Sequence, residues 1–414
     1  MSLATGPRRN VAIRNANAPS GARARALSLG IACAPLLCAA AARAGELKLQ
    51  PYAVGNYEYN SNIAAVAPGD PANVLQGDPH RDDRIKRGAA GLNMRYGWSR
   101  QVLTLQAEGR RYSYDHFSRL NHDESLLSAD LDWQLASALD GKLSASRERR
   151  MADLKTRLTS ALVLETESDA ASTFNVHLGP DWRLETGARP RDLDSPQPGF
   201  PDYGLRETAG DLALRYLVPA GWSVGLAGER ISGDYHGGNL APSYRQTSID
   251  GTASYGDGEP TLLKAALGYT RRSDPAVNAP ALSATTGLLS YARKLTGKTS
   301  VLVSYQRAVN SYVIAAASEV DSTATLKVDW EATRKLSVVL GYTHTGSTFS
   351  GETVPLTNTA RSDQYAATNL DIGYAITRWV TISPYGLYQT RTSNSSYFQY
   401  NGAVVGIRLR VQRP

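Results

Sequence analysis

The 414-residue chain has no cysteine and no long apolar run after Ala44. Without a run of about 18 apolar residues, that region cannot form a transmembrane helix. Without cysteine it cannot form a disulfide framework, so hydrogen bonding and burial must hold it together. Phenylalanine is scarce, with five residues against 22 tyrosines, and tyrosine suits a partly wetted interface better than a dry core. Helical periodicity is also missing, which leaves a β-rich fold.

The first 44 residues have the features of a secretory signal peptide. Five arginines precede an apolar stretch from Leu27 to Ala42, and Ala42-Arg43-Ala44 is a small-residue cleavage motif. We therefore expect cleavage after Ala44 and one mature domain over residues 45–414. Residues 1–44 hold six of the 45 basic residues and none of the 38 acidic ones, so the mature chain is nearly neutral. This charge gives no basis for nucleic-acid binding.

Residues 127–146, LSADLDWQLASALDGKLSAS, alternate between apolar and polar side chains. Leucines and Trp133 fall on one side, and Asp130 and Asp132 fall on the other. A period of two is typical of a β-strand, and Asp140-Gly141 is a turn signal. The stretch therefore predicts a hairpin with one apolar and one polar face.

Similar hairpins recur along the chain. Short turns are expected at residues 98–100, 136–141, 180–181, 218–221, 256–260, 295–297, 332–335 and 376–378. Longer polar stretches lie between the hairpins, among them residues 61–83, 150–167, 190–205, 273–282 and 346–362. Eight short turns and nine long loops separate 18 strands, which is the plan of an outer-membrane barrel. We predict an all-β fold, a transmembrane antiparallel β-barrel of about 18 strands with short periplasmic turns and long extracellular loops.

Aromatic residues cluster near the predicted strand ends. The interface aromatics expected on the short-turn side are Trp98, Trp133, Trp182, Trp222, Trp330 and Trp379, with several tyrosines beside them. The tyrosines near the long loops are Tyr57, Tyr59, Tyr112, Tyr114, Tyr235, Tyr244, Tyr269, Tyr305, Tyr388 and Tyr397. Two aromatic rings around an aliphatic band are typical of a membrane barrel. A soluble β-sandwich, the alternative, would place its aromatics in mid-strand.

Charged residues occupy the polar face of the predicted strands, where they would line a water-filled lumen. The lumen-lining candidates are Arg95, Glu108, Arg110, Asp130, Asp132, Arg183, Glu185, Arg189, Asp211, Arg215, Glu229, Asp250, Lys264, Asp329 and Asp371. The acids that precede short turns are expected to share one depth as a partial ring. These charges can form a selectivity ladder, or they can brace the wall as cross-strand ion pairs; bracing is the simpler interpretation.

No catalytic, cofactor-binding or metal site is expected. The six histidines lack metal-ligand spacing, and only His177 is predicted to lie in mid-strand facing the lumen. No serine is marked as a nucleophile, and no glycine-rich phosphate loop is present. An enzyme is therefore not predicted.

The most distinctive local motif is Tyr57-Glu58-Tyr59-Asn60-Ser61-Asn62-Ile63, on the first predicted strand. An early Y-x-Y-x-S-N-I in an all-β chain of this length resembles the putative beta-barrel porin family, and within it the outer-membrane proteins of exopolysaccharide biosynthesis loci, the EpsL type. The resemblance implies a role in exopolysaccharide export or assembly. Outer-membrane barrels usually end on an aromatic residue, whereas this chain ends Val411-Gln412-Arg413-Pro414.

These features predict a protein of the Gram-negative outer membrane. Its expected partners are outer-membrane lipid, the barrel assembly machinery and, for export, polysaccharide and periplasmic export components. The main functional hypothesis is an exopolysaccharide channel. The alternatives are a general diffusion porin for small hydrophilic solutes and a structural or adhesive barrel. The sequence leaves the oligomeric state open between a monomer and a trimer.

Overall fold

The computed structural model describes residues 45–63, 65–67, 80–152, 162–196, 203–236, 243–256, 261–273, 281–312, 317–350 and 361–413. The predicted signal peptide, residues 1–44, lies outside the described residues. Within the described part of the chain, no helix is long and apolar enough to cross a membrane.

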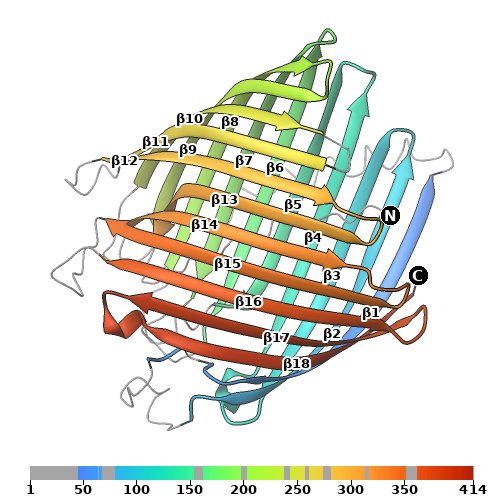
Figure 1. Cartoon of the computed structure of the whole chain (residues 1–414), viewed down its shortest axis with the longest axis vertical. Coiled ribbons are helices and arrows are strands. Elements are labelled where there is room, and N and C mark those ends of the chain that lie inside the picture. The colour runs from blue at the N-terminus through green and yellow to red at the C-terminus, as the bar shows by residue number, and fades with distance from the viewer. Residues whose placement is uncertain are drawn as a thin grey trace.

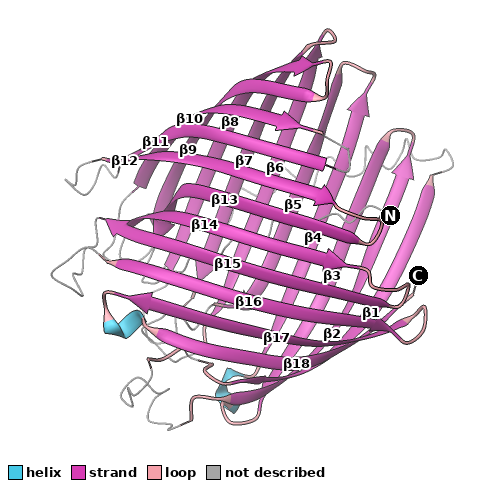
Figure 2. Cartoon of the chain, in the orientation of Figure 1, coloured by secondary structure: helices cyan, strands magenta, loops and turns pink. Residues whose placement is uncertain are grey.

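The described residues are almost entirely β-strand, with two short 3-10 turns at Ser118–Leu120 and Ser396–Phe398 (Figure 2). The strands are β1 (Glu46–Asn60), β2 (Asp83–Trp98), β3 (Gln101–Tyr114), β4 (His122–Leu135), β5 (Leu139–Met151), β6 (Leu164–Leu178), β7 (Trp182–Ser195), β8 (Tyr203–Val218), β9 (Trp222–His236), β10 (Ser243–Tyr255), β11 (Thr261–Ser273), β12 (Leu282–Lys294), β13 (Thr299–Tyr312), β14 (Ala317–Trp330), β15 (Leu336–Ser350), β16 (Ser362–Ala375), β17 (Val380–Ser393) and β18 (Tyr400–Gln412).

The strands form one closed antiparallel barrel. Each strand pairs with its neighbours in sequence, and β1 also pairs with β18, so the sheet has no free edge. Figure 1 shows β10 to β18 crossing in front of β1 to β9. At the seam, Gln412 lies opposite Tyr52 and Val411 lies opposite Ala53. The predicted 18-strand count is confirmed. Short and longer connections alternate as predicted with one exception: only residues 313–316 join β13 to β14, fewer than in the short turns between β10 and β11 and between β14 and β15.

The hairpin of β4 and β5 shows how the alternation produces two faces. Leu131 lies opposite Leu143 and Asp130 lies opposite Ser144, so apolar residues pair with apolar residues and polar residues with polar residues across the two strands. Leu127 is 61% exposed on the apolar face, which only a lipid environment makes favourable over a whole band. Gly141 is required beside Trp133, because a Cβ at this position would come within 2.1 Å of a backbone oxygen and 2.7 Å of the indole.

The strands are longer than a membrane crossing requires. They contain 13 to 16 residues, whereas about 9–11 tilted residues span the hydrocarbon. The extra residues lie on the long-loop side: Pro190–Ser195 belongs to β7, and Tyr203–Leu205 belongs to β8. The prediction of a loop over residues 190–205 was therefore too wide, because polar strands above the membrane carry no apolar alternation to reveal them.

The short-turn aromatics lie at strand ends as predicted. Trp182 packs against Tyr216 at 5.0 Å and Trp222 against Tyr255 at 4.9 Å between ring centroids. Trp98, Trp330 and Trp379 also lie at or next to strand ends, and Trp133 lies two residues before the end of β4.

The predicted second aromatic ring is correct only in part. Five of its tyrosines are exposed on the apolar face: Tyr57, Tyr59, Tyr269, Tyr305 and Tyr388. Tyr114 and Tyr244 are instead buried, and Tyr112 and Tyr235 share the inner face with charged residues. Proximity to a loop could not separate these groups, because the face depends on odd or even position along the strand.

Candidate functional site: the lumen wall and its mouth

The predicted lumen-lining residues all occupy the face opposite the exposed apolar band. On each strand they alternate with outward residues: Asp130 and Asp132 with the leucines of β4, Asp211 and Arg215 with those of β8, and Lys264 with Leu267. The inner positions on the other strands are those of Arg95, Glu108, Arg110, Arg183, Glu185, Arg189, Glu229, Asp250, Asp329 and Asp371.

Ion pairs link neighbouring strands near the long-loop end of this face. Arg110 contacts Glu108 and lies 2.8 Å from Glu148. Arg87 extends this chain of charges to β2, at 3.3 Å from Glu108. Each arginine donates to at least one carboxylate on another strand, an arrangement that ties strands together through charge-assisted hydrogen bonds.

The chain of charges continues towards β8. Arg150 lies 2.8 Å from Glu165 and 2.7 Å from Glu167. Arg191 lies 2.5 Å from Glu167 and 3.0 Å from Glu207. We call the whole set the upper ionic network: Arg87, Glu108, Arg110, Glu124, Glu148, Arg150, Glu165, Glu167, Arg191 and Glu207.

Sequence reasoning found only Glu108 and Arg110 of this network. Arg150, Glu165 and Glu167 fell in the stretch 150–167, which was predicted to be a long loop, and Arg191 fell in the stretch 190–205, which was predicted to be another. The alternation itself would have found them. Every second residue of β5 points inwards, and extending this pattern beyond the last alternating apolar residues places Glu148 and Arg150 on the inner face.

A second tier of pairs lies closer to the short turns. Arg189 contacts Asp211 at 2.5 Å and also contacts Glu229. Glu185 forms ion pairs with both Arg183, at 2.7 Å, and Arg215, at 2.8 Å. Three acids pair singly: Asp130 with Lys142, Asp329 with Lys327 and Asp371 with Arg408. Within the described residues, Arg95, Asp132, Asp250 and Lys264 form no ion pair.

The predicted acidic residues are not level with one another. Asp329 is the last but one residue of β14, whereas Asp211 lies midway along β8. The expectation of a partial ring at one depth is therefore wrong. The short turns differ in length and the strands differ in where they end, so equal distance from a turn was a poor measure of depth.

His177 does not lie in mid-strand as predicted. It is the last but one residue of β6, and its Nε2 is 2.6 Å from Asp140 on β5. Among the described residues no group of three or more His, Cys, Asp and Glu side chains is arranged to hold a metal ion.

The mouth on the long-loop side contains a small hydrophobic cluster. Phe117 and Leu120, from the β3–β4 connection, are fully buried against Ile63, Ile85 and Tyr114. The connection is held by Asp83, whose carboxylate accepts hydrogen bonds from the backbone N–H groups of residues 115, 116 and 117. This part of the mouth is therefore fixed by packing rather than left open.

The Tyr57–Ile63 motif has a structural explanation at the same place. The two tyrosines face outwards, whereas Asn62 is buried and donates to the carbonyls of Val66 and Asn401. Ser61 Oγ accepts the backbone N–H of Ala403. The motif thus fastens the end of β1 to β18, the strand that closes the barrel.

A second cluster lies at the ends of β15 to β17. The Arg361 guanidinium is 4.2 Å from the Phe349 ring and 3.4 Å from the Phe398 ring. It also pairs with Asp363 at 2.6 Å, which in turn contacts Arg391. A paired arginine between two aromatic faces is a rigid unit.

Hydroxyl side chains line the inner face between these charged regions. Ser248, Thr270 and Thr286 form a chain across β10, β11 and β12, with oxygen–oxygen distances of 2.9 Å and 3.0 Å. Thr323 and Thr345 make a similar 3.0 Å contact between β14 and β15. The lumen therefore combines an ionic wall over β2 to β9 with a more neutral, hydroxyl-rich wall.

A family model matches part of the chain. Residues 258–413, which form β11 to β18, match the family described as "Putative beta-barrel porin 2". This match supports the predicted resemblance to beta-barrel porins, whereas the resemblance to the EpsL type stays a prediction. No curated protein matches the sequence.

Several solved structures are similar in outline. OccK2 (OpdF) from Pseudomonas aeruginosa has a TM-score of 0.47 at 12% identity, over 89% of this chain and 97% of that one. The siderophore receptor PirA from Acinetobacter baumannii has a TM-score of 0.45 at 9% identity, over 88% and 80% of the two chains. These similarities are too distant to transfer a function.

The upper ionic network predicts a stability effect. Arg150→Ala should lower the free energy of unfolding by about 1–3 kcal/mol, because it leaves three carboxylates without their shared cation in a partly desolvated wall. Guanidinium unfolding of the purified barrel in detergent measures this change.

The matched control is Lys86→Ala. Lys86 lies 2.7 Å from Asp115, and its ammonium holds the pKa of the Asp115 carboxyl below its ordinary value, but this pair is exposed to solvent. Little or no change in stability is expected for this variant. Equal effects of the two substitutions would contradict a bracing role for the network.

Proposed function

We propose that the protein is a water-filled channel of the outer membrane for small hydrophilic solutes. The main observation behind this proposal is the closed barrel of 18 strands, which has an outward apolar band and a polar inner face. Barrels of about 16–18 strands enclose an aqueous channel. The family match over β11 to β18 supports a porin-like role.

The arrangement of charge favours weak ion selectivity. In both tiers of the lumen wall the arginines are paired with carboxylates, and the upper ionic network has only a small acidic excess, six glutamates against four arginines, so the net charge of the wall is low. Strongly selective channels instead present rings of one sign. Thr323 and Thr345 on the inner face are only half-buried, and their hydroxyls add neutral donors and acceptors that suit uncharged polar solutes.

Planar-bilayer recording of the purified mature barrel tests this proposal. We expect steady conductance with a cation-to-anion permeability ratio within about threefold of one. Arg189→Gln should raise that ratio by about twofold or more, because Asp211 and Glu229 then lack their shared cation.

The control for the selectivity change is Arg271→Gln. Arg271 lies on the outer face of β11 and is exposed, so its loss should leave the permeability ratio unchanged. Absence of any conductance from a correctly folded barrel would overturn the proposal. A ratio that responds equally to both substitutions would show that the Arg189 cluster does not line the ion path.

A second candidate, export of a charged polysaccharide, is favoured by one observation. Arg183, Arg189 and Arg191 all occupy the inner face of β7 and form a column along the strand, with Arg215 beside it on β8. Such a column offers successive contacts to an anionic polymer moving along the lumen. In this case periplasmic export components would be partners.

Deletion of the gene distinguishes the two candidates. For export, secreted exopolysaccharide should fall while periplasmic polymer accumulates, relative to the parent strain. For a diffusion channel, the polymer should be unchanged while uptake of small hydrophilic solutes slows. Unchanged polymer on both sides of the membrane would eliminate the export candidate.

A further inference from the structure

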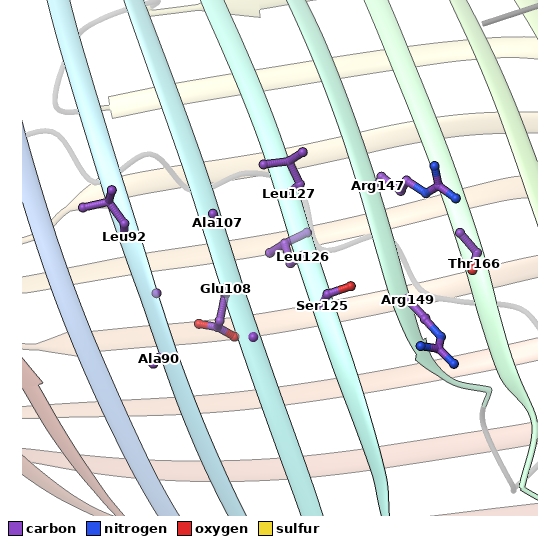
Figure 3. A pocket seen from close by; sticks show the side chains of 12 residues that line it. Ala90, Leu92, Ala107, Glu108, Ser125, Leu126, Leu127, Arg147, Arg149 and Thr166 are labelled. Carbon is purple, nitrogen blue, oxygen red and sulfur yellow. The ribbon is translucent and has the colours of Figure 1, made fainter.

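We propose that a hollow on the outer face of β2 to β6 binds a phosphorylated glycolipid of the surrounding leaflet. The inference rests on the proposed outer-membrane location, in which such lipids face the long-loop half of the barrel. The hollow has a volume of about 780 Å³ and lies on the apolar side of the wall, away from the lumen (Figure 3).

Nine of the residues that line the hollow belong to two adjacent rows of outward residues, and the inner-face residues Gly91, Glu108 and Leu126 lie in the register between these rows. In the upper row, strand pairing aligns Ala90, Gly109, Ser125, Arg149 and Thr166. The small residues Ala90, Gly109 and Ser125 form the floor of the hollow, and the long side chain of Arg149 stands at its edge (Figure 3).

The lower row supplies the apolar part of the site. It aligns Leu92, Ala107, Leu127 and Arg147. Leu92 and Leu127 are strongly exposed, so they continue the lipid-facing band up to the arginines. A ligand filling both rows would place acyl chains against leucine and a polar head against guanidinium.

The two arginines have no counter-charge within the described residues. Arg147 and Arg149 are exposed and form no ion pair there, whereas the next row up contains the paired Arg111 and Asp123 at 3.2 Å. An unpaired arginine on the lipid-facing side is costly unless it reaches the interface and finds an anion. Arginine binds phosphate through its planar fork of donors.

The position of the site along the barrel fits a lipid head group. Arg147 and Arg149 follow the last apolar outward residues of β5, Leu143 and Ala145. On β2, the strand at the other edge of the hollow, the outward residues above it are Gly88, Lys86 and Arg84, and the last two lie opposite the interface residues Tyr57 and Tyr59. The hollow therefore begins in the hydrocarbon band and ends at the level of the interface.

A substitution of Gly109 tests the shape of the hollow separately from the charge of its arginines. A Cβ at this position would meet nothing within 4 Å, so Gly109→Leu should fold while filling the floor. Arg147→Gln with Arg149→Gln removes the charges and keeps the floor. Arg245→Gln with Arg271→Gln is the matched control, because both of these exposed outward arginines lie far away on β10 and β11.

Native mass spectrometry of the full mature barrel, titrated with bisphosphorylated lipid A, measures the binding. Heat-modifiable mobility on gels first confirms that each variant is folded. We expect one tightly bound lipid on the parent, about tenfold weaker binding for Arg147→Gln with Arg149→Gln, and weaker binding for Gly109→Leu. The β10–β11 control should bind like the parent, and inorganic phosphate alone should not compete.

Four results would overturn the inference, and the first three concern binding by variants and by a modified lipid. These are equal binding by the double arginine variant, equal binding of dephosphorylated lipid A, and an equal loss in the β10–β11 control, which would indicate a diffuse basic belt. Competition by inorganic phosphate would show that the acyl chains do not contribute and would also overturn it. Lipid binding does not need conductance, so a non-conducting barrel that still binds lipid would refute the channel and leave this site standing.

Discussion

Hydrogen bonding of the backbone is the constraint on which this structure depends. No water is available inside a bilayer to satisfy N–H and C=O groups, so a β-sheet can cross only as a closed ring. The pairing of β1 with β18 supplies that closure. Ser61 and Asn62 strengthen the seam at the long-loop end, where they bond to residues 401 and 403 near the start of β18.

The closed sheet also separates the lipid outside from the lumen inside by a wall that is one strand thick. Because successive side chains point to opposite faces, each strand delivers leucine and valine to lipid and polar groups to the lumen. Where the strands extend beyond the hydrocarbon, the inner face carries the upper ionic network and the outer face carries arginine. The same alternation thus produces the braced lumen, the mixed charge of the proposed channel and the outward hollow.

Local signals explain what could be predicted from the sequence. The period of two around Leu127 and the turns near Asp140 and Pro180 depend on neighbouring residues only, so strand number and order followed from them. The inward orientation of Asp130 and of Arg189 could be predicted from odd or even position along the strand alone. In contrast, the contact of Arg150 with Glu167 depends on strand extension above the membrane, and the burial of Phe117 and Leu120 depends on how a connection folds back. The hollow depends on register across five strands, which no single stretch of sequence contains.

Single-cysteine labelling along β4 tests the central claim most directly. Residues 45–414 contain no cysteine, so in a protein that consists of these residues each introduced thiol reports alone. With the barrel in lipid bilayers, a membrane-impermeant maleimide should label cysteines at Ser128, Asp130 and Asp132 and spare those at Leu127, Ala129 and Leu131. This period of two is the result that a closed, water-filled barrel in lipid predicts. Uniform labelling of all six positions, or labelling of the leucine positions alone, would contradict it.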